Sequence, residues 1–156
     1  MKIGDVSVAG VAVAVIVGMA IGAMWYSPLL FGPQWMALSG YRMTEGAAEM
    51  MGVSYALGTL ATIAQAVVLA ILLCWLKVDS VRGGIIVAAI VWFGFAATTE
   101  AYGFIYAGHP IALFAINAGY TLVNFVAMAV VLSAWRARTA KTAARAAATG
   151  TAGKPG

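Results

Sequence analysis

Four long stretches of apolar side chains constrain this chain more than any other feature of its sequence. They cover about residues 6–26, 53–76, 84–106 and 111–135. Each reaches the roughly 20 residues that an α-helix needs to cross the hydrocarbon core of a bilayer. We therefore predict an all-α, polytopic membrane protein in which four transmembrane helices form a bundle.

The composition excludes an ordinary soluble domain. Of the 156 residues, 63% are hydrophobic and only 9% are charged, whereas a soluble domain carries roughly 25% charged residues. So few charges cannot cover a water-facing surface, but lipid tails readily surround an apolar one. The single cysteine, Cys74, excludes an intrachain disulfide and is expected to serve packing only.

The first stretch has two readings, a retained transmembrane helix or a cleaved signal peptide. Ala20 and Gly22 supply the small residues that a cleavage site needs. However, the stretch is long for a signal peptide and continues into Trp25 and Tyr26, which suit an aromatic anchor at the membrane interface. We expect the helix to be retained.

A short interfacial segment is predicted after the first helix. Pro28 and Pro33, together with Gly32, are expected to stop that helix and impose a turn. The following apolar side chains are too few to span the bilayer but suffice for a segment that lies along its surface. They are Trp35, Met36, Leu38 and Tyr41.

Residues 136–156 form a basic tail after a membrane domain of residues 1–135. The tail is rich in alanine, threonine and glycine and has too few large apolar side chains to pack. We expect it to be helical at first and largely disordered beyond. Its basic residues should contact anionic lipid, at about 1 kcal/mol each, and not nucleic acid.

The lysines and arginines predict the orientation of the bundle. With four spans, Lys2, Lys77, Arg82 and the five basic residues of the tail share one side, and Arg42 alone lies on the other. Because positively charged loops stay in the cytoplasm, we expect a multi-pass protein with both termini cytoplasmic.

Glu100 is the most informative polar residue, because an acid inside a spanning helix costs at least about 2.5 kcal/mol on insertion scales. It lies about 7 Å from the middle of the third span, towards the outer face, at about 1.5 Å per residue. The same arithmetic places Asn117 of the fourth span and Thr59 and Thr62 of the second at that depth. Three helices therefore offer polar groups at one level.

Polar residues also recur at helical spacing, which predicts polar stripes facing the bundle interior. One role is structural, since hydrogen bonds between helices contribute about 0.6 to 2 kcal/mol. The other is functional, with Glu100 able to release a proton. The predicted polar cluster comprises Glu100, Asn117, Asn124, Gln65, Thr59, Thr62 and Tyr120.

Gly18 and Gly22 form a pattern of small residues that lets another helix approach closely, within the bundle or in a dimer. His109 stands in an outer turn without a second histidine or a cysteine nearby. We therefore expect no metal site there and regard His109 as an ordinary loop residue.

Two sequence runs resemble a known family. One is Trp25-Tyr26-Ser27-Pro28-Leu29-Leu30-Phe31-Gly32, followed by Trp35, and the other is residues 116–123, followed by Trp135. Together they are similar to a bacterial membrane-protein family called domain of unknown function 1761, from about residue 5 to 136. The resemblance implies a four-helix architecture in the bacterial cytoplasmic (inner) membrane and supplies no activity.

The sequence contains no complete catalytic constellation, nucleotide-binding glycine loop or zinc-protease motif. We therefore expect no enzyme and no cofactor. The leading hypothesis is a non-enzymatic membrane protein that forms a homo-oligomer or serves as an accessory subunit of a larger membrane complex. The alternative is a small transporter or proton-linked permeation protein that uses Glu100, with Asn117 and Gln65 lining the route.

Overall fold

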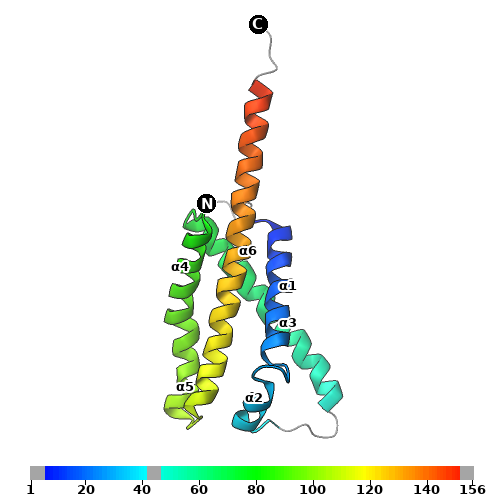
Figure 1. Cartoon of the computed structure of the whole chain (residues 1–156), viewed down its shortest axis with the longest axis vertical. Helices are drawn as coiled ribbons and strands as arrows, with labels where there is room; N and C mark the ends of the chain where they lie inside the picture. The colour runs from blue at the N-terminus through cyan, green and yellow to red at the C-terminus, as the bar shows by residue number, and fades with distance from the viewer. Residues whose placement is uncertain (1–5, 42–46, 152–156) are drawn as a thin grey trace.

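The computed structural model describes residues 6–41 and 47–151, which contain helices and turns and no strand (Figure 1). Four of its helical segments are long and apolar enough to cross a membrane, which confirms the predicted all-α architecture with four spans. The helices are α1 (Val8–Trp25), α2 (Gly32–Ser39), α3 (Ala47–Trp75), α4 (Val81–Val91), the π-helix η2 (Trp92–Ala97), α5 (Thr98–Tyr106) and α6 (Ile111–Thr151).

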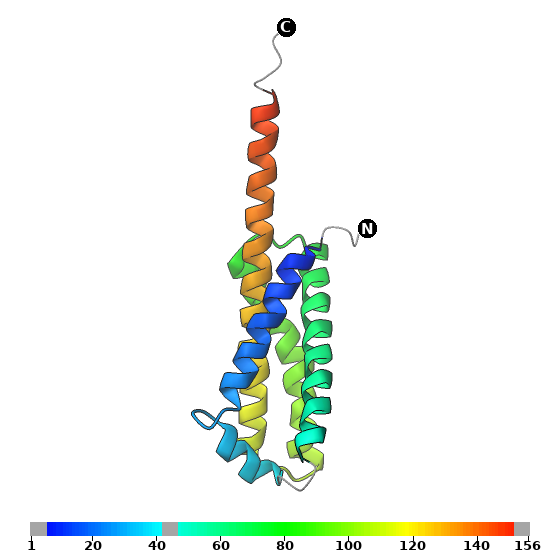
Figure 2. The same cartoon turned by 90° about the vertical axis from the view of Figure 1, so that its right-hand side faces the viewer.

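α1 begins and ends at recognisable signals. The Ser7 hydroxyl caps the helix by accepting a hydrogen bond from the backbone N–H of Gly10 at 3.2 Å. After Trp25 the chain reverses so tightly that a Cβ at Gly32 would collide with the Tyr26 carbonyl oxygen. The predicted interfacial segment is α2, which lies across one end of the bundle (Figure 2). We call this the α2 end, and the opposite end the tail end.

Pro33 plays a different role from the one expected. It lies in the first turn of α2, where a proline needs no N–H partner, so it starts this helix. At its other end α2 stops at Gly40, whose φ of 70° is a left-handed conformation that glycine adopts without strain.

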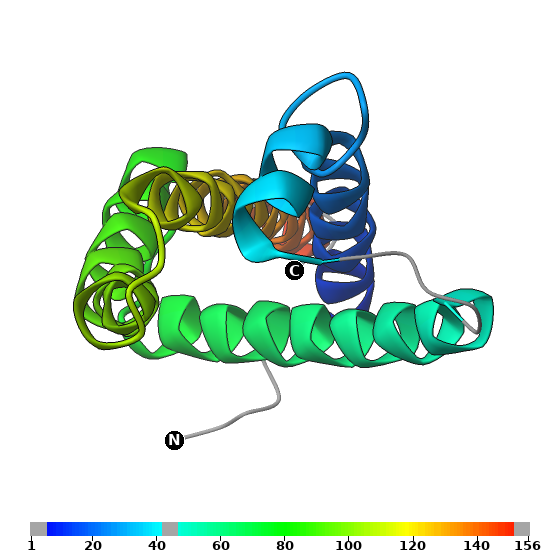
Figure 3. The same cartoon turned by 90° about the horizontal axis from the view of Figure 1, so that it is seen from below.

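α6 is the central helix of the bundle. It packs against α1, α3, α4 and α5, and it lies between α1 and the α4–α5 segment when viewed from the α2 end (Figure 3). The core is formed where these helices meet in the half nearer the tail end. Its most buried members include Ala14, Leu73, Ala88 and Met128.

α3 diverges from the bundle towards the α2 end (Figure 1). In its second half Leu69 is 4% exposed and Leu73 is fully buried, whereas in its first half Leu57 is 61% exposed and Leu60 is 62% exposed. The first half of α3 therefore has large apolar side chains that the bundle does not cover.

The third span is interrupted by η2, a π-helical segment between α4 and α5. At its start the indole N–H of Trp92 donates to the Ala118 carbonyl at 2.9 Å and to the Thr121 hydroxyl at 3.1 Å. A π turn adds a residue relative to the α-helical repeat and so changes which residues of the following helix face α6.

α6 continues as a helix to Thr151 and extends beyond the bundle at the tail end (Figures 1 and 2). The sequence-based expectation of a largely disordered tail thus differs from the structure up to that residue, and residues 152–156 lie outside the described part. That expectation rested only on the lack of large apolar side chains that could pack against the bundle. Alanine has the strongest helix propensity, and an existing helix is extended without a new nucleation step.

Candidate functional site

Glu100 and Asn117 meet because α5 and α6 are consecutive antiparallel helices. The chain reverses between them through Gly108, whose φ is 68°, and the backbone N–H of His109 donates to the Gly103 carbonyl at 3.1 Å. Across the resulting interface the Asn117 amide donates to a Glu100 carboxylate oxygen at 3.4 Å. The carboxyl group is partly buried.

Tyr26 extends this contact to a third segment. Its hydroxyl donates to the Asn117 side-chain oxygen at 3.3 Å, so Asn117 connects the end of α1 with α5. The neighbouring Trp25 donates its indole N–H to the Ile116 carbonyl at 3.2 Å. We call Glu100, Asn117 and Tyr26 the polar chain.

Residues of the run 25–35, which carries the family resemblance, hold this arrangement in place. The Trp25 and Phe31 rings lie 4.8 Å apart across the reversal, and the Tyr26 and Trp35 rings lie 5.6 Å apart, edge to face. The Ser27 hydroxyl accepts from the backbone N–H of Leu29 at 3.3 Å. The motif therefore forms a turn that places aromatic side chains of α1 and α2 against α6.

Tyr120 belongs to the same region. Its ring lies 5.1 Å from that of Tyr26 and 6.4 Å from that of Trp25. Gly22 of α1 leaves room for it, because a Cβ at Gly22 would lie only 3.1 Å from the Tyr120 hydroxyl.

Asn124 and Thr62 form a second polar group, away from the polar chain. Both are buried, and a Cβ at Gly18 would lie 2.9 Å from the Asn124 side-chain oxygen and 3.1 Å from the Thr62 methyl carbon. Among the described residues, the Asn124 oxygen has no hydrogen-bond partner. Gly18 and Gly22 therefore serve close packing of α1 within the bundle.

The structure does not bring the polar residues of α3 to Glu100. Thr59 and Thr62 donate their hydroxyl protons to carbonyls of their own helix, on Tyr55 and Gly58, at 2.8 and 2.9 Å. Gln65 is partly exposed and forms no hydrogen bond within the described residues. Equal depth did not imply contact, because Thr62 is buried against Gly18 of α1 and Thr59 lies on the half of α3 that diverges from the bundle.

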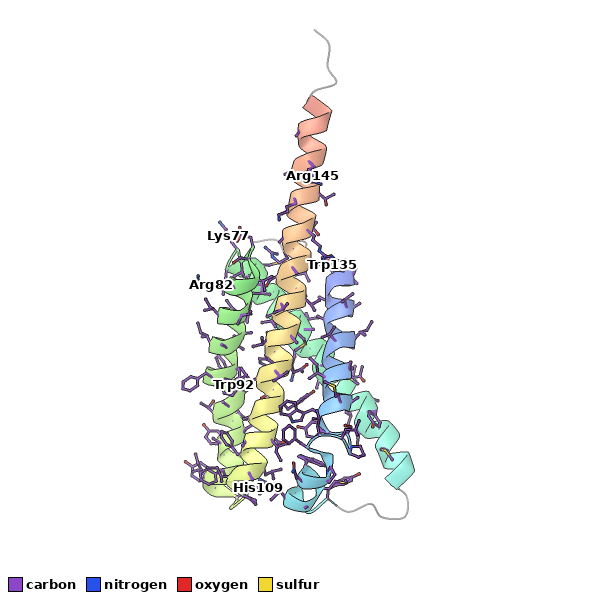
Figure 4. All side chains as sticks on the ribbon, viewed as in Figure 1. Lys77, Arg82, Trp92, His109, Trp135 and Arg145 are labelled. Carbon is purple, nitrogen blue, oxygen red and sulfur yellow. The ribbon has the colours of Figure 1, made fainter. Side chains whose placement is uncertain are left out.

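An open hollow of about 240 Å³ lies beside Glu100, between α2, α5 and α6. Its polar walls are Glu100, Asn117, His109 and Thr99, and Trp35, Phe104 and Phe114 supply aromatic rings. Figure 4 shows His109 at the α2 end, far from Lys77, Arg82 and Arg145.

The sequence analysis missed His109 as a site residue. A Cβ at Gly103 would lie 2.8 Å from the His109 ring nitrogen Nδ1, so this glycine lets the imidazole lie against α5, one turn beyond Glu100. Glu100 and Gly103 are three residues apart and so lie on one face of α5, which the sequence already indicates. Only the fold of the following turn places the His109 ring against that face.

A second open groove, of about 290 Å³, separates α1 from the diverging half of α3. We call it the α1–α3 groove. It is uncharged, and hydroxyl groups from α3, from α6 and from the residue that follows α1 contribute to its lining. The lining residues with hydroxyl groups are Tyr26, Ser54, Tyr55, Thr62 and Tyr120.

Within the described part of the chain, no group of three or more histidine, cysteine, aspartate or glutamate residues lies close enough together to hold a metal ion.

Comparison with known proteins identifies a family. A family model described as "Protein of unknown function (DUF1761)" matches residues 9–133, from the start of α1 to the part of α6 that ends at the bundle. No curated protein and no solved structure matches the chain.

Proposed function

The chain belongs to the DUF1761 family of proteins of unknown function, and from this premise we propose that it is a non-enzymatic integral membrane protein that acts as a homo-oligomer. One observation carries the proposal, namely the α1–α3 groove. In the hydrocarbon region water is absent, so a groove with a polar lining is better filled by a protein helix than by lipid tails. A transmembrane helix that fills the groove also buries exposed side chains of α3, among them Tyr55.

The chemistry of the groove favours a second copy of this chain as the occupant. A two-fold contact places the same surface of both copies against each other, so the surface must be self-complementary. The groove lining has no charged side chain to repel its own copy, and its hydroxyl groups act as both donors and acceptors. Gly58 at its rim has nothing within 4 Å of its Cβ position, which leaves space for a neighbouring helix.

We propose a non-enzymatic protein because the hollow beside Glu100 holds an incomplete set of catalytic groups. In the described part of the chain, no hydrogen bond joins the His109 imidazole to a hydroxyl, a thiol or a carboxyl group. A nucleophile activated by a base would require such a contact.

We also propose that the protein lies in the bacterial inner membrane with both termini in the cytoplasm. Support comes from the positions of the described basic residues. Lys77 and Arg82 lie at the tail end and Arg145 beyond it (Figure 4), so anionic headgroups of the inner leaflet would surround them. The α2 end then faces outward.

The test of self-association compares two glycines whose Cβ positions are both open, Gly58 in the groove and Gly94 in η2. Native mass spectrometry of the full chain in lipid particles should report a dimer for the natural protein and for Gly94→Leu. Gly58→Leu should reduce the dimer to monomer, because its side chain occupies the groove. A monomeric natural protein contradicts the proposal, and stable capture of a different subunit would replace it with an accessory role.

A second candidate function is proton-linked permeation, favoured by the position of Glu100 beside an open hollow at the α2 end. It requires the carboxyl group to exchange a proton with the outer side. Glu100→Gln should then abolish proton flux in liposomes that contain the protein, whereas Asp79→Asn, an acidic residue at the tail end, should leave the flux unchanged. Equal flux through the natural protein and Glu100→Gln would exclude this function.

A further inference from the structure

The hollow beside Glu100 has an unusual charge composition. Its lining contains one carboxylate and no lysine or arginine. Within the described residues the carboxylate forms no ion pair, and its one hydrogen bond comes from the Asn117 amide at 3.4 Å. A carboxylate has about four sites that accept hydrogen bonds, so most of its acceptor capacity remains open to a ligand.

The other walls of the hollow suit a cation as well. Trp35, Phe104 and Phe114 come from α2, α5 and α6 and bring aromatic rings to the site. Aromatic faces attract organic cations, and tryptophan does so most strongly. The Trp35 ring is held between Tyr26 and Tyr41, with ring centroids 5.6 and 5.7 Å away, so it is positioned before a ligand arrives.

From this arrangement we propose that the hollow beside Glu100 binds the ammonium group of a small organic amine, with Glu100 as the counter-ion and Trp35 as the aromatic wall. The His109 imidazole and the Thr99 hydroxyl also line the hollow and can act as further acceptors. A primary ammonium donates three hydrogen bonds and so matches Glu100, His109 and the Thr99 hydroxyl better than a quaternary ammonium does. This inference does not require self-association, because the hollow and the α1–α3 groove share no lining residue.

Size and position restrict the ligand. A volume of about 240 Å³ is below the range of roughly 300 to 1,000 Å³ found for drug-sized ligands, so the hollow accommodates a small amine or one headgroup. The aromatic residues of the α2 end are of the kind that lies at headgroup depth. The ammonium group therefore comes either from a free amine or from a lipid headgroup, and the chemistry of recognition is the same.

The free-amine arm uses the full chain in lipid particles made of phosphatidylglycerol, which has no ammonium group. Ethanolamine and choline are titrated at constant ionic strength, and binding is followed by calorimetry. We expect ethanolamine to bind more tightly than choline. Glu100→Gln should weaken binding at least about tenfold, equivalent to about 1.4 kcal/mol, and Trp35→Leu should also weaken it.

Three further variants separate binding from folding. Glu100→Asp keeps the negative charge and should retain measurable binding. Asp79→Asn and Trp75→Leu remove an acid and an exposed indole at the tail end and should bind like the natural protein. If these two variants weaken binding as much as Glu100→Gln and Trp35→Leu, the assignment to this hollow is overturned.

The lipid arm uses native mass spectrometry after extraction from an equimolar mixture of phosphatidylethanolamine and phosphatidylglycerol. Preferential retention of phosphatidylethanolamine that is lost in Glu100→Gln identifies a headgroup as the source, and calorimetric binding alone identifies a free amine. Either result supports the site. The proposal is overturned if neither ethanolamine nor phosphatidylethanolamine binds, or if both bind equally well to Glu100→Gln.

Discussion

At the scale of single residues, close approach between helices depends on positions that have no side chain or a small one. Gly18 lies against Asn124 and Thr62, and Gly84 of α4 lies directly against Ser133 of α6. In lipid the hydrophobic effect does not bring helices together, so their association depends on van der Waals packing. Small residues allow a close approach that larger side chains would prevent. The cost is that Asn124 and Ser133 are each left with a buried oxygen that has no partner among the described residues.

Gly84→Ala tests this packing. The added methyl group would overlap the Ser133 hydroxyl and lie 3.1 Å from the Ala129 carbonyl oxygen, and overpacking of this kind costs about 1 to 3 kcal/mol. Thermal unfolding in detergent should show a lower melting temperature for Gly84→Ala. Adding Ser133→Ala should restore part of the loss, because it removes the overlapping hydroxyl.

Gly52→Ala is the matched control for that experiment. Nothing lies within 4 Å of the Cβ position of Gly52 in α3, so alanine there should leave the melting temperature unchanged or raise it through its higher helix propensity. If Gly84→Ala melts at the same temperature as the natural protein, α4 and α6 are further apart than the structure describes.

At the scale of elements, two irregularities decide where polar residues lie. The π-helix η2 changes the register between α4 and α5, so that Trp92 and Glu100 both reach α6. The divergence of α3 separates Thr59 from Glu100. Neither feature follows from apolar periodicity, because periodicity reveals neither an extra residue in one turn nor the tilt of a helix relative to its neighbours.

Deletion of Gly94 should remove the extra residue of the π turn and convert η2 into regular α-helix. Because the π turn absorbs that residue, Glu100 should stay against Asn117, whereas insertion of one alanine after Gly94 should rotate the following helix by about 100° and move it by about 1.5 Å. In a Cys74→Ser background, cysteines introduced at positions 100 and 117 should cross-link with a short reagent in the full-length chain. The deletion and Gly94→Ala should preserve the cross-link, and the insertion should abolish it. Loss of the cross-link after the deletion would show that η2 does not absorb an extra residue.

At the scale of the whole molecule, the bundle is polarised along its long axis. Among the described residues, the polar chain, α2 and His109 occupy one end, and the basic side chains gather at or beyond the other (Figure 4). An even number of spans places the two chain ends on the same side of the bilayer. In the proposed orientation, with both termini in the cytoplasm, the ammonium site lies at the outer surface.

Thiol labelling of intact cells tests this orientation. In a Cys74→Ser background, Ser39→Cys at the end of α2 should react with a membrane-impermeant maleimide, because the α2 end is expected outside. Thr139→Cys, in the exposed extension of α6, should react only after the membrane is permeabilised. The reverse labelling pattern would invert the topology and place the hollow beside Glu100 in the cytoplasm.

The sequence alone determined the features that depend on local composition. Four apolar stretches predicted four spans, and the proline-rich and glycine-rich connection predicted α2. The depth of Glu100 and Asn117 predicted a pair that the structure joins, because consecutive antiparallel helices with a short turn are neighbours. These inferences needed only helix length, rise per residue and chain direction.

Only the tertiary structure decided which polar groups touch and which remain apart. Thr59, Thr62 and Gln65 share the predicted level or stripe, yet the packing of α3 against α1 and α6 keeps them from Glu100. The reversal after α1, in contrast, brings Tyr26 and Trp35 to α6. His109 joins the hollow because Gly103 leaves space for its ring. Helix tilt and side-chain fit arise from the packing of all helices together, so no single stretch of sequence contains them.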